Sequence, residues 1–206
     1  RLKTDWLDLY QIHYFDEQTP IEETMRALDD LVRQGKVRYI GCSTFAAWRV
    51  VEALWTAKHL NLNAFVSCEN QYSLLKRSIE RDLVPVMQNY GLGLLPWSPL
   101  ASGMLSGEHR RNAPLPEGSR MADPWYAKRW LTDETWDKVE KLQAFATQRG
   151  HSLLELALSW LAARPAVSSI IAGATKPEHL EANVKAADWA LSLEEMAEID
   201  KITAAQ

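Results

Sequence analysis

Cysteine and long apolar runs are both scarce in this sequence. The 206 residues include only two cysteines, Cys42 and Cys68, and both lie in apolar runs that are typical of strands. We therefore expect buried free thiols rather than a disulfide or a metal pair, and no metal site. No apolar run is long enough to span a bilayer, and residues 1–5 lack the apolar core of a signal peptide. We expect no membrane partner and a reducing, cytoplasmic setting.

Positive charge is not in excess either. The 23 lysines and arginines are outnumbered by 27 aspartates and glutamates, and the net charge of −4 argues against a nucleic-acid partner. The one tight basic cluster, residues 109–111, lies near two prolines and is typical of a solvated loop. The content of hydrophobic residues, 47%, is ordinary for a soluble globular protein. The length suits one sizeable domain, so we expect residues 1–206 to form a single domain.

Apolar runs alternate with helical patterns along the chain. The expected strands are residues 6–12, 37–42, 64–68, 92–97 and 167–172. A first helix is expected to begin with Thr19 as its N-cap and Glu22 at the capping-box position, and to end at Gly35. Further helices are expected around residues 50–55 and at 79–90, 134–149, 153–163, 177–187 and 193–202. Residues 101–131 are expected to be irregular.

One phosphate-binding motif is missing from the sequence. The glycine-rich G-x-G-x-x-G turn that follows the first strand of a doubly wound sheet does not occur. The competing α/β architecture is the (β/α)8 TIM barrel, whose functional residues lie at the carboxyl ends of many strands. Polar or aromatic residues follow all five expected strands, from His13 after the first to Lys176 after the last. This pattern favours the barrel, although five strand–helix units are fewer than eight.

Five segments of the chain resemble the aldo-keto reductase superfamily, in the branch of bacterial aldo-keto reductases and potassium-channel β subunits. They are residues 1–45, NQYSLLKR, LLPWSPLASGMLSG, EGSRMA and IIAGATKPEHLEANV. The resemblance implies a (β/α)8 barrel that binds NADP(H) without a Rossmann motif. It also implies hydride transfer between the nicotinamide and a small-molecule carbonyl or alcohol. The strands of this chain correspond to strands four to eight of that barrel, and we expect its first three strands to be absent.

The same resemblance assigns roles to residues at the first three strand ends. His13 corresponds to the active-site histidine, which can donate a hydrogen bond to a substrate carbonyl. Ser43 and Thr44 correspond to the pair that contacts the nicotinamide carboxamide. Glu69 takes the place of a glutamine with that role, and a glutamate can accept from the amide but not donate to it. Gln71 lies on the same side of the strand and is an alternative to Glu69.

The fourth strand end and the following loop correspond to the centre of the cofactor site. The resemblance implies that Trp97 stacks on the nicotinamide ring. It implies that a loop wraps the pyrophosphate, with Arg120 on the same phosphates. The loop residues are Ser98, Pro99, Leu100, Ser102 and Gly103. The aromatic residues of 125–130 either line a pocket or simply pack.

The last strand end corresponds to the adenosine end of the cofactor. The residues assigned there are Gly173, Thr175, Lys176, His179 and Asn183. Exposed N–H groups at the start of the following helix favour phosphate, and Lys176 can meet an adenosine 2′-phosphate. The resemblance therefore favours NADP(H) over NAD(H).

The proton-donating tyrosine of the family, with its lysine and aspartate, belongs to strands that have no counterpart in residues 1–206. We therefore expect these residues to be inactive alone, because carbonyl reduction needs a positioned proton donor. Two alternatives stay open, which are a non-catalytic NADP(H)-binding regulatory module and a truncated product. His13 favours the enzyme. Unpaired strand edges predict a homo-oligomer or association with the absent N-terminal segment.

Overall fold

The computed structural model describes residues 2–204, and these divide into two compact units. The first unit runs to Asn70 and includes Ser78–Leu95. The second unit includes Gln71–Arg77 and continues from Pro96. Each unit is described by itself.

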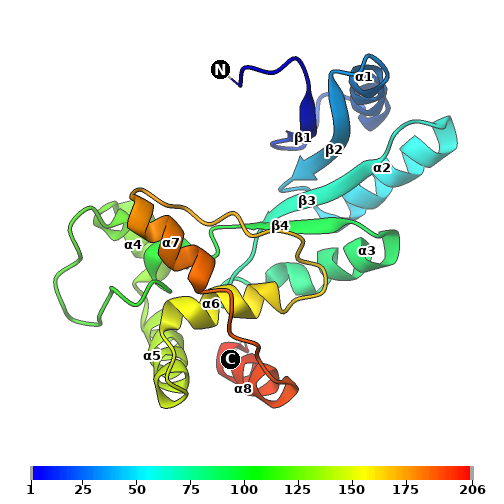
Figure 1. Cartoon of the computed structure of the whole chain (residues 1–206). Helices are drawn as coiled ribbons and strands as arrows, with labels where there is room; N and C mark the ends of the chain where they lie inside the picture. Colours follow the sequence, from blue (N-terminus) through cyan, green and yellow to red (C-terminus); the bar gives the residue numbers. More distant parts are fainter. Residues whose placement is uncertain (1, 205–206) are drawn as a thin grey trace. The chain divides into compact units, whose positions relative to one another are not determined.

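The first unit holds a parallel sheet with helices between its strands (Figure 1). Its elements are β1 (Leu7–Ile12), α1 (Ile21–Arg33), β2 (Val37–Ser43), α2 (Ala47–Leu60), β3 (Phe65–Gln71), a 3-10 turn (Ser78–Glu80), α3 (Leu83–Tyr90) and β4 (Gly93–Trp97). The strand order is β1-β2-β3-β4, and β2 pairs in parallel with both β1 and β3. Parallel strands joined in order by helices are consistent with part of a (β/α)8 barrel, as predicted.

The two faces of this sheet differ in chemistry. Ile40, Cys42 and Cys68 lie on one face, and their side chains are fully buried. Cys42 and Cys68 are partners in adjacent strands. Their sulfur atoms are 3.6 Å apart, and both thiols are free. The prediction of buried free thiols is confirmed. Alternation along the strands then places Gln11 and Ser67 on the other face, which is polar toward the carboxyl ends of the strands.

The second unit is mostly helical. Its elements are two 3-10 turns (Ala101–Gly103 and Arg120–Ala122), α4 (Pro124–Trp130), α5 (Asp133–Gln148), α6 (Leu153–Ala162), α7 (Pro177–Lys185) and α8 (Leu193–Thr203). The Trp160 ring is fully buried and lies 5.1 Å from the Tyr72 ring. A capping box begins α6, where Ser152 and Glu155 exchange hydrogen bonds.

Three local predictions are wrong. Thr19 does not cap α1, because its hydroxyl donates to Asp16 instead and Pro20 takes the N-cap position without a side-chain bond. Residues 167–172 form no strand, and only Ile171 makes a bridge, donating its N–H to Pro96. Residues 124–130 form helix α4 rather than an irregular segment, because Asp123 caps it and Pro124 occupies its first turn.

No helix within residues 2–204 is long and apolar enough to cross a bilayer.

Candidate functional site

The carboxyl ends of β1, β2 and β3 bring three predicted residues to one level. Ile12 is the partner of Cys42, so His13 follows at the level of Ser43, and Ser43 is the direct partner of Glu69. Residues at one level of adjacent parallel strands point to the same face. His13, Ser43 and Glu69 thus form a row at one level of the first unit, and Ser43 and Glu69 point to the same face as Gln11 and Ser67.

A second row lies two residues earlier along the same strands and consists of Gln11, Gly41 and Ser67. Gln11 joins the two rows, because its Nε2 donates to the Glu69 carboxylate at 2.7 Å and its Oε1 accepts from the Ser67 hydroxyl at 3.0 Å. Gly41 lies between Gln11 and Ser67 in register, and a Cβ there would lie 2.4 Å from the Ser67 hydroxyl oxygen. The glycine is thus required for the bridge to form. Gln11 fixes one carboxylate oxygen of Glu69 and leaves the other oxygen able to accept.

Two residues in or beside the first row, His13 and Thr44, are exposed. The His13 ring lies 4.3 Å from the Tyr14 ring. Thr44 follows the buried Ser43 with a φ of 60°, and its N–H donates to the Glu69 carbonyl oxygen. A non-glycine residue in this left-handed region is uncommon and often marks a functional position. The hydroxyls of Ser43 and Thr44 lie 3.3 Å apart.

The second unit contains a pocket of about 260 Å³, close to the lower end of small-molecule sites. It gathers six residues assigned to the cofactor from the sequence, namely Trp97, Ser98, Pro99, Ser102, Arg120 and Gly173. The remaining lining residues are Gln71, Trp125, Tyr126, Arg129, Trp130 and Ile171. The six were separated by up to 76 positions in the sequence, and their convergence supports a shared site.

The segment that borders this pocket has an unusual backbone. Ser98, Ala101 and Ser102 have φ values of 55°, 47° and 60°, and Gly103 has a φ of 109°. Within this segment Pro99 has no N–H, and the N–H groups of Ala101 and Gly103 donate to the carbonyl oxygens of Ser98 and Leu100. The N–H groups of Ser98, Leu100 and Ser102 are therefore the ones suited to an anion. Leu100 and Gly103 do not line the pocket themselves, but they belong to this segment.

The His109 ring packs against Gly103. A Cβ at position 103 would lie 3.2 Å from Cε1 of the His109 ring, and residues with a Cβ rarely adopt its φ of 109°, so glycine is favoured there. His109 is 6% exposed, and its Nε2 lies 2.8 Å from the Ser119 hydroxyl, which in turn accepts from Met121 N–H. Burial lowers the pKa of His109. The expectation that residues 109–111 are a solvated loop is therefore wrong for His109, although the segment is a loop and Arg110 is exposed.

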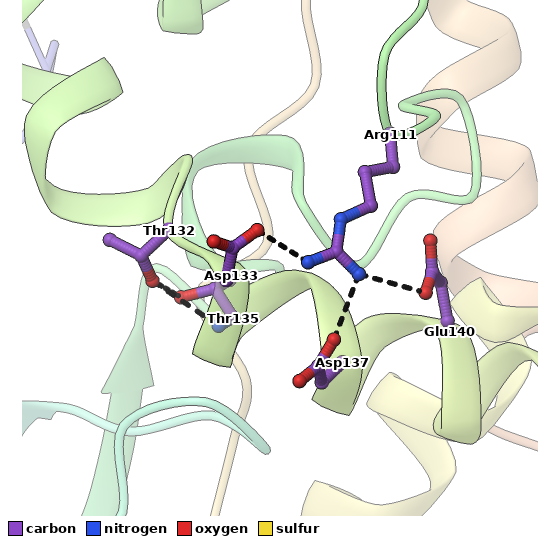
Figure 2. Close-up of polar contacts among 6 residues, drawn as sticks. All are labelled: Arg111, Thr132, Asp133, Thr135, Asp137 and Glu140. Atoms are coloured by element: carbon purple, nitrogen blue, oxygen red, sulfur yellow. Dashed lines mark hydrogen bonds and ion pairs between the residues drawn. The ribbon is translucent and has the colours of Figure 1, made fainter.

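Arg111 ties the same loop to α5 (Figure 2). Its guanidinium donates to Asp137 at 2.8 Å, to Glu140 at 3.4 Å and also to Asp133. These three carboxylates follow one side of α5 at helical spacing, and the hydrogen bonds to Asp133 and Asp137 raise the pKa of Arg111. Residues 104–119 are thus anchored at His109 and again at Arg111.

The predicted adenosine-end residues form a separate group at the start of α7. Lys176 is the N-cap residue and is exposed, and the Thr175 hydroxyl lies 3.3 Å from Nδ1 of His179. Asn183 donates from its side chain to the carbonyl oxygen of Gly173 at 3.3 Å. Of this group only Gly173 also lines the pocket, so Asn183 is the hydrogen-bonded link between α7 and the pocket wall.

Several site residues were missed or left open in the sequence. Gln11 was missed, although a polar residue two positions before His13 in an apolar strand was a usable signal. Gln71 was proposed only as a substitute for Glu69, but it lines the pocket of the second unit. Arg129 was missed because α4 was not expected. Asp123 followed by Pro124 was the signal that predicts that helix.

The charge of the pocket is one-sided. Two arginines, Arg120 and Arg129, line it, and no carboxylate does. Neither guanidinium pairs with a carboxylate of residues 2–204. In a chain of net charge −4, this cationic pocket favours an anionic ligand with a flat group to place against tryptophan. Within the same residues no group of three histidine, cysteine or acidic side chains could hold a metal ion.

Comparison with known proteins gives a consistent result. The family model described as the aldo/keto reductase family matches residues 1–204. The chain is 40% identical over 192 residues to a probable voltage-gated potassium channel subunit beta of Oryza sativa subsp. japonica, covering 91% of this chain and 58% of the relative. It is 32% identical to the L-glyceraldehyde 3-phosphate reductase of Escherichia coli strain K12, covering 98% and 59%. It is 34% identical to an aryl-alcohol dehydrogenase [NADP(+)] of Phanerodontia chrysosporium, covering 95% and 51%.

The matched share of the relatives is limited. The chain spans between 51% and 60% of the length of these and similar curated relatives, and the match to the family model covers nearly all of the chain itself.

Proposed function

Because the chain belongs to the aldo/keto reductase family, we propose that it carries the NADP(H) site and part of the active site of a carbonyl reductase. The observation that carries this proposal is the pocket of the second unit. It combines Trp97, two arginines without carboxylate partners and a left-handed backbone segment. The NADP(+)-dependent relative from Phanerodontia chrysosporium supports the choice of cofactor.

The pocket residues suit the parts of a dinucleotide. The half-buried indole of Trp97 offers a flat apolar wall for the nicotinamide ring. The N–H groups of Ser98, Leu100 and Ser102 and the guanidinium of Arg120 suit the pyrophosphate. Lys176 at the start of α7 is assigned to the 2′-phosphate, which makes NADP(H) the preferred cofactor over NAD(H).

The row of the first unit suits the reacting end. When bound, the reduced nicotinamide supplies a hydride to the carbonyl carbon, and a proton from a donor completes the alcohol. His13 is assigned to donate a hydrogen bond to the carbonyl oxygen, which stabilises the charge that develops there. Ser43 and the free oxygen of Glu69 are assigned to the nicotinamide carboxamide, with Gln11 holding the Glu69 carboxylate.

The proton donor is proposed to come from outside these residues. The family's tyrosine has no counterpart in residues 1–206, so we expect no carbonyl reduction by these residues alone. β1 is an edge strand of the sheet, and Leu9 and Tyr10 on it are partly exposed. Such an edge suits pairing with a further strand-bearing segment or with a second copy of the chain. The two free thiols suit a reducing compartment such as the cytoplasm.

A second candidate function is regulation by cofactor binding without turnover. The resemblance to a probable potassium channel subunit beta at 40% identity is the observation that favours it. His13 favours the enzyme, because a regulatory module has no need of a donor beside the carbonyl. The two candidates share the cofactor pocket and differ only in turnover.

Two measurements test the proposal. Quenching of tryptophan emission by NADPH, in the protein expressed from its complete gene, measures the affinity of the cofactor. Oxidation of NADPH with a panel of aldehydes, followed near 340 nm (roughly where the reduced ring absorbs), measures turnover. We expect binding and turnover in the complete protein and no turnover by residues 1–206. Absence of NADPH binding by the complete protein would exclude both candidates, and binding without turnover would favour the regulatory one.

A further inference from the structure

Arg129 has an unusual position in the pocket of the second unit. Its Nη2 donates to the Oε1 of Gln71 at 2.6 Å, which uses one of its five N–H groups. Its guanidinium carbon lies 5.1 Å from the Trp130 ring and 5.6 Å from the Trp125 ring. The guanidinium is thus oriented by three neighbours while it stays exposed. A cation held in this way loses little further side-chain entropy when it binds an anion.

Arg129 also lacks a charge partner of its own. Among the described residues no carboxylate lies within ion-pair distance of it, whereas Arg111, Arg149 and Arg164 all have such partners. An arginine that is oriented but not neutralised retains its full attraction for a carboxylate or phosphate in the pocket.

Strand register shows which end of the pocket Arg129 serves. The N–H of Tyr72 donates to the carbonyl oxygen of Trp97 at 3.4 Å, so the neighbouring Gln71 lies beside Trp97. Because Arg129 is bonded to Gln71, it belongs to the Trp97 end of the pocket. Arg120 lines the same pocket from the 3-10 turn after Ser119, which His109 ties to the Gly103 segment.

The two cations are thus attached to different segments of the pocket wall. If the nicotinamide stacks on Trp97, the carbonyl carbon must approach that ring within about 3–3.5 Å to accept a hydride. An anionic group that binds Arg129 is then part of the substrate that is reduced, and Arg120 binds the pyrophosphate of the cofactor. We propose that Arg129, oriented by Gln71, binds a carboxylate or phosphate of the carbonyl substrate, and that the enzyme prefers anionic aldehydes or ketones. The inference rests on the function proposed above.

The test compares substrates that differ only in charge. Suitable pairs are 4-carboxybenzaldehyde with its methyl ester, and glyceraldehyde 3-phosphate with glyceraldehyde, which separate carboxylate from phosphate. In the protein expressed from its complete gene, kcat/KM for at least one anionic member is expected to exceed that of its neutral partner about tenfold. Arg129→Met should bring that ratio close to one, mainly by raising KM for the anionic substrate. Lys128→Met, which removes the neighbouring cation that does not line the pocket, should keep the wild-type ratio.

The outcomes separate the inference from the function beneath it. Equal kcat/KM within both pairs, or a ratio that survives Arg129→Met, would overturn the inference and leave the reductase proposal intact. An NADPH affinity that falls in Arg129→Met as much as the ratio does would place Arg129 on the cofactor and also overturn it. If no aldehyde is reduced, the same comparison uses quenching of tryptophan emission by each aldehyde in the presence of NADP+. Equal affinities of the charged and neutral partners would then contradict the inference.

Discussion

The two units hold their candidate functional residues in place by different means. In the first unit, strand register places His13, Ser43 and Glu69 in one row, and hydrogen bonds from Gln11 steady it. In the second unit, Trp97 lines a pocket together with residues of the left-handed segment 98–103 and of helix α4. Neither of these elements follows from the periodicity of a strand. Regular strands position side chains through the backbone ladder. The irregular segment needs long-range contacts, such as those of His109 and Arg111, to hold its shape.

The largest expected effect concerns the row of the first unit. His13→Ala is expected to lower kcat of the complete protein by about 10²-fold or more, because one hydrogen-bond donor to the developing oxyanion is lost. The affinity for NADPH should change much less. His59→Ala, at an exposed position on α2, is the matched control and should retain wild-type kcat. A kcat within about threefold of wild type for His13→Ala would contradict the assigned role.

Gly41 offers a direct comparison of packing in the two units. Gly41→Ala places a Cβ against Ser67 and Gln11 and should lower the free energy of unfolding by about 1–3 kcal/mol. Gly173→Ala meets no atom within 4 Å and should change it by less than about 0.5 kcal/mol. Urea unfolding curves of both variants measure the difference. Equal effects of the two substitutions would show that the polar rows are not tightly packed.

The next effect belongs to the pocket of the second unit. Trp97→Ala is expected to weaken NADPH binding about fivefold or more, because about 1 kcal/mol of ring contact is lost. Isothermal titration is the suitable measurement, since the substitution removes one of the fluorescent reporters. Trp48→Ala, which removes an exposed indole from α2, should bind NADPH as the wild type does. Unchanged affinity of Trp97→Ala would remove the stacking assignment.

A smaller effect is expected at the start of α7. Lys176→Ala should weaken NADPH binding severalfold and leave NADH binding nearly as it was, because only NADPH carries the 2′-phosphate. Lys185→Ala, at the other end of the same helix, provides the control. Equal losses for both cofactors would assign Lys176 to the pyrophosphate or to the helix itself.

The smallest effect is a pH dependence in the second unit. Burial lowers the pKa of His109 below its unfolded value of 6.5, so the folded state resists the proton that the unfolded chain accepts. The stability that follows from this difference is present above pH 6.5 and is lost as the pH falls from 6.5 through the lower folded pKa. Urea unfolding at pH 7.5 and 5.5 measures it. His109→Gln should reduce the pH dependence, and an unchanged pH dependence would contradict a titrating role for His109.

The sequence predicted the regular parts of the molecule well. Apolar runs and helical spacing located four strands and most of the helices, and the strand-end rule correctly grouped Ser43 with Glu69. Residues 167–172 were predicted wrongly, since an apolar run does not reveal that only Ile171 makes a bridge. The left-handed values at Ser98, Ala101 and Ser102 could not be predicted, because none of these residues is glycine and tertiary contacts impose the conformation.

Candidate site residues followed the same division. Trp97, Arg120 and Gly173 were assigned through the family resemblance, and all three line the pocket. The burial of His109 depends on Ser119 and Gly103, which lie 10 and 6 positions away and form no periodic pattern. Loop contacts of this kind leave no signal in the local sequence, which is why a solvated loop was expected there.

A crystal structure of the complete protein with NADP+ tests most directly whether the pocket of the second unit is the nicotinamide site. We predict the nicotinamide ring on the Trp97 indole at about the 4.5–7 Å centroid separation of aromatic pairs. We also predict the pyrophosphate against the N–H groups of Ser98, Leu100 and Ser102, within reach of Arg120. A dinucleotide bound elsewhere, or a nicotinamide ring that does not contact Trp97, would contradict the proposed function.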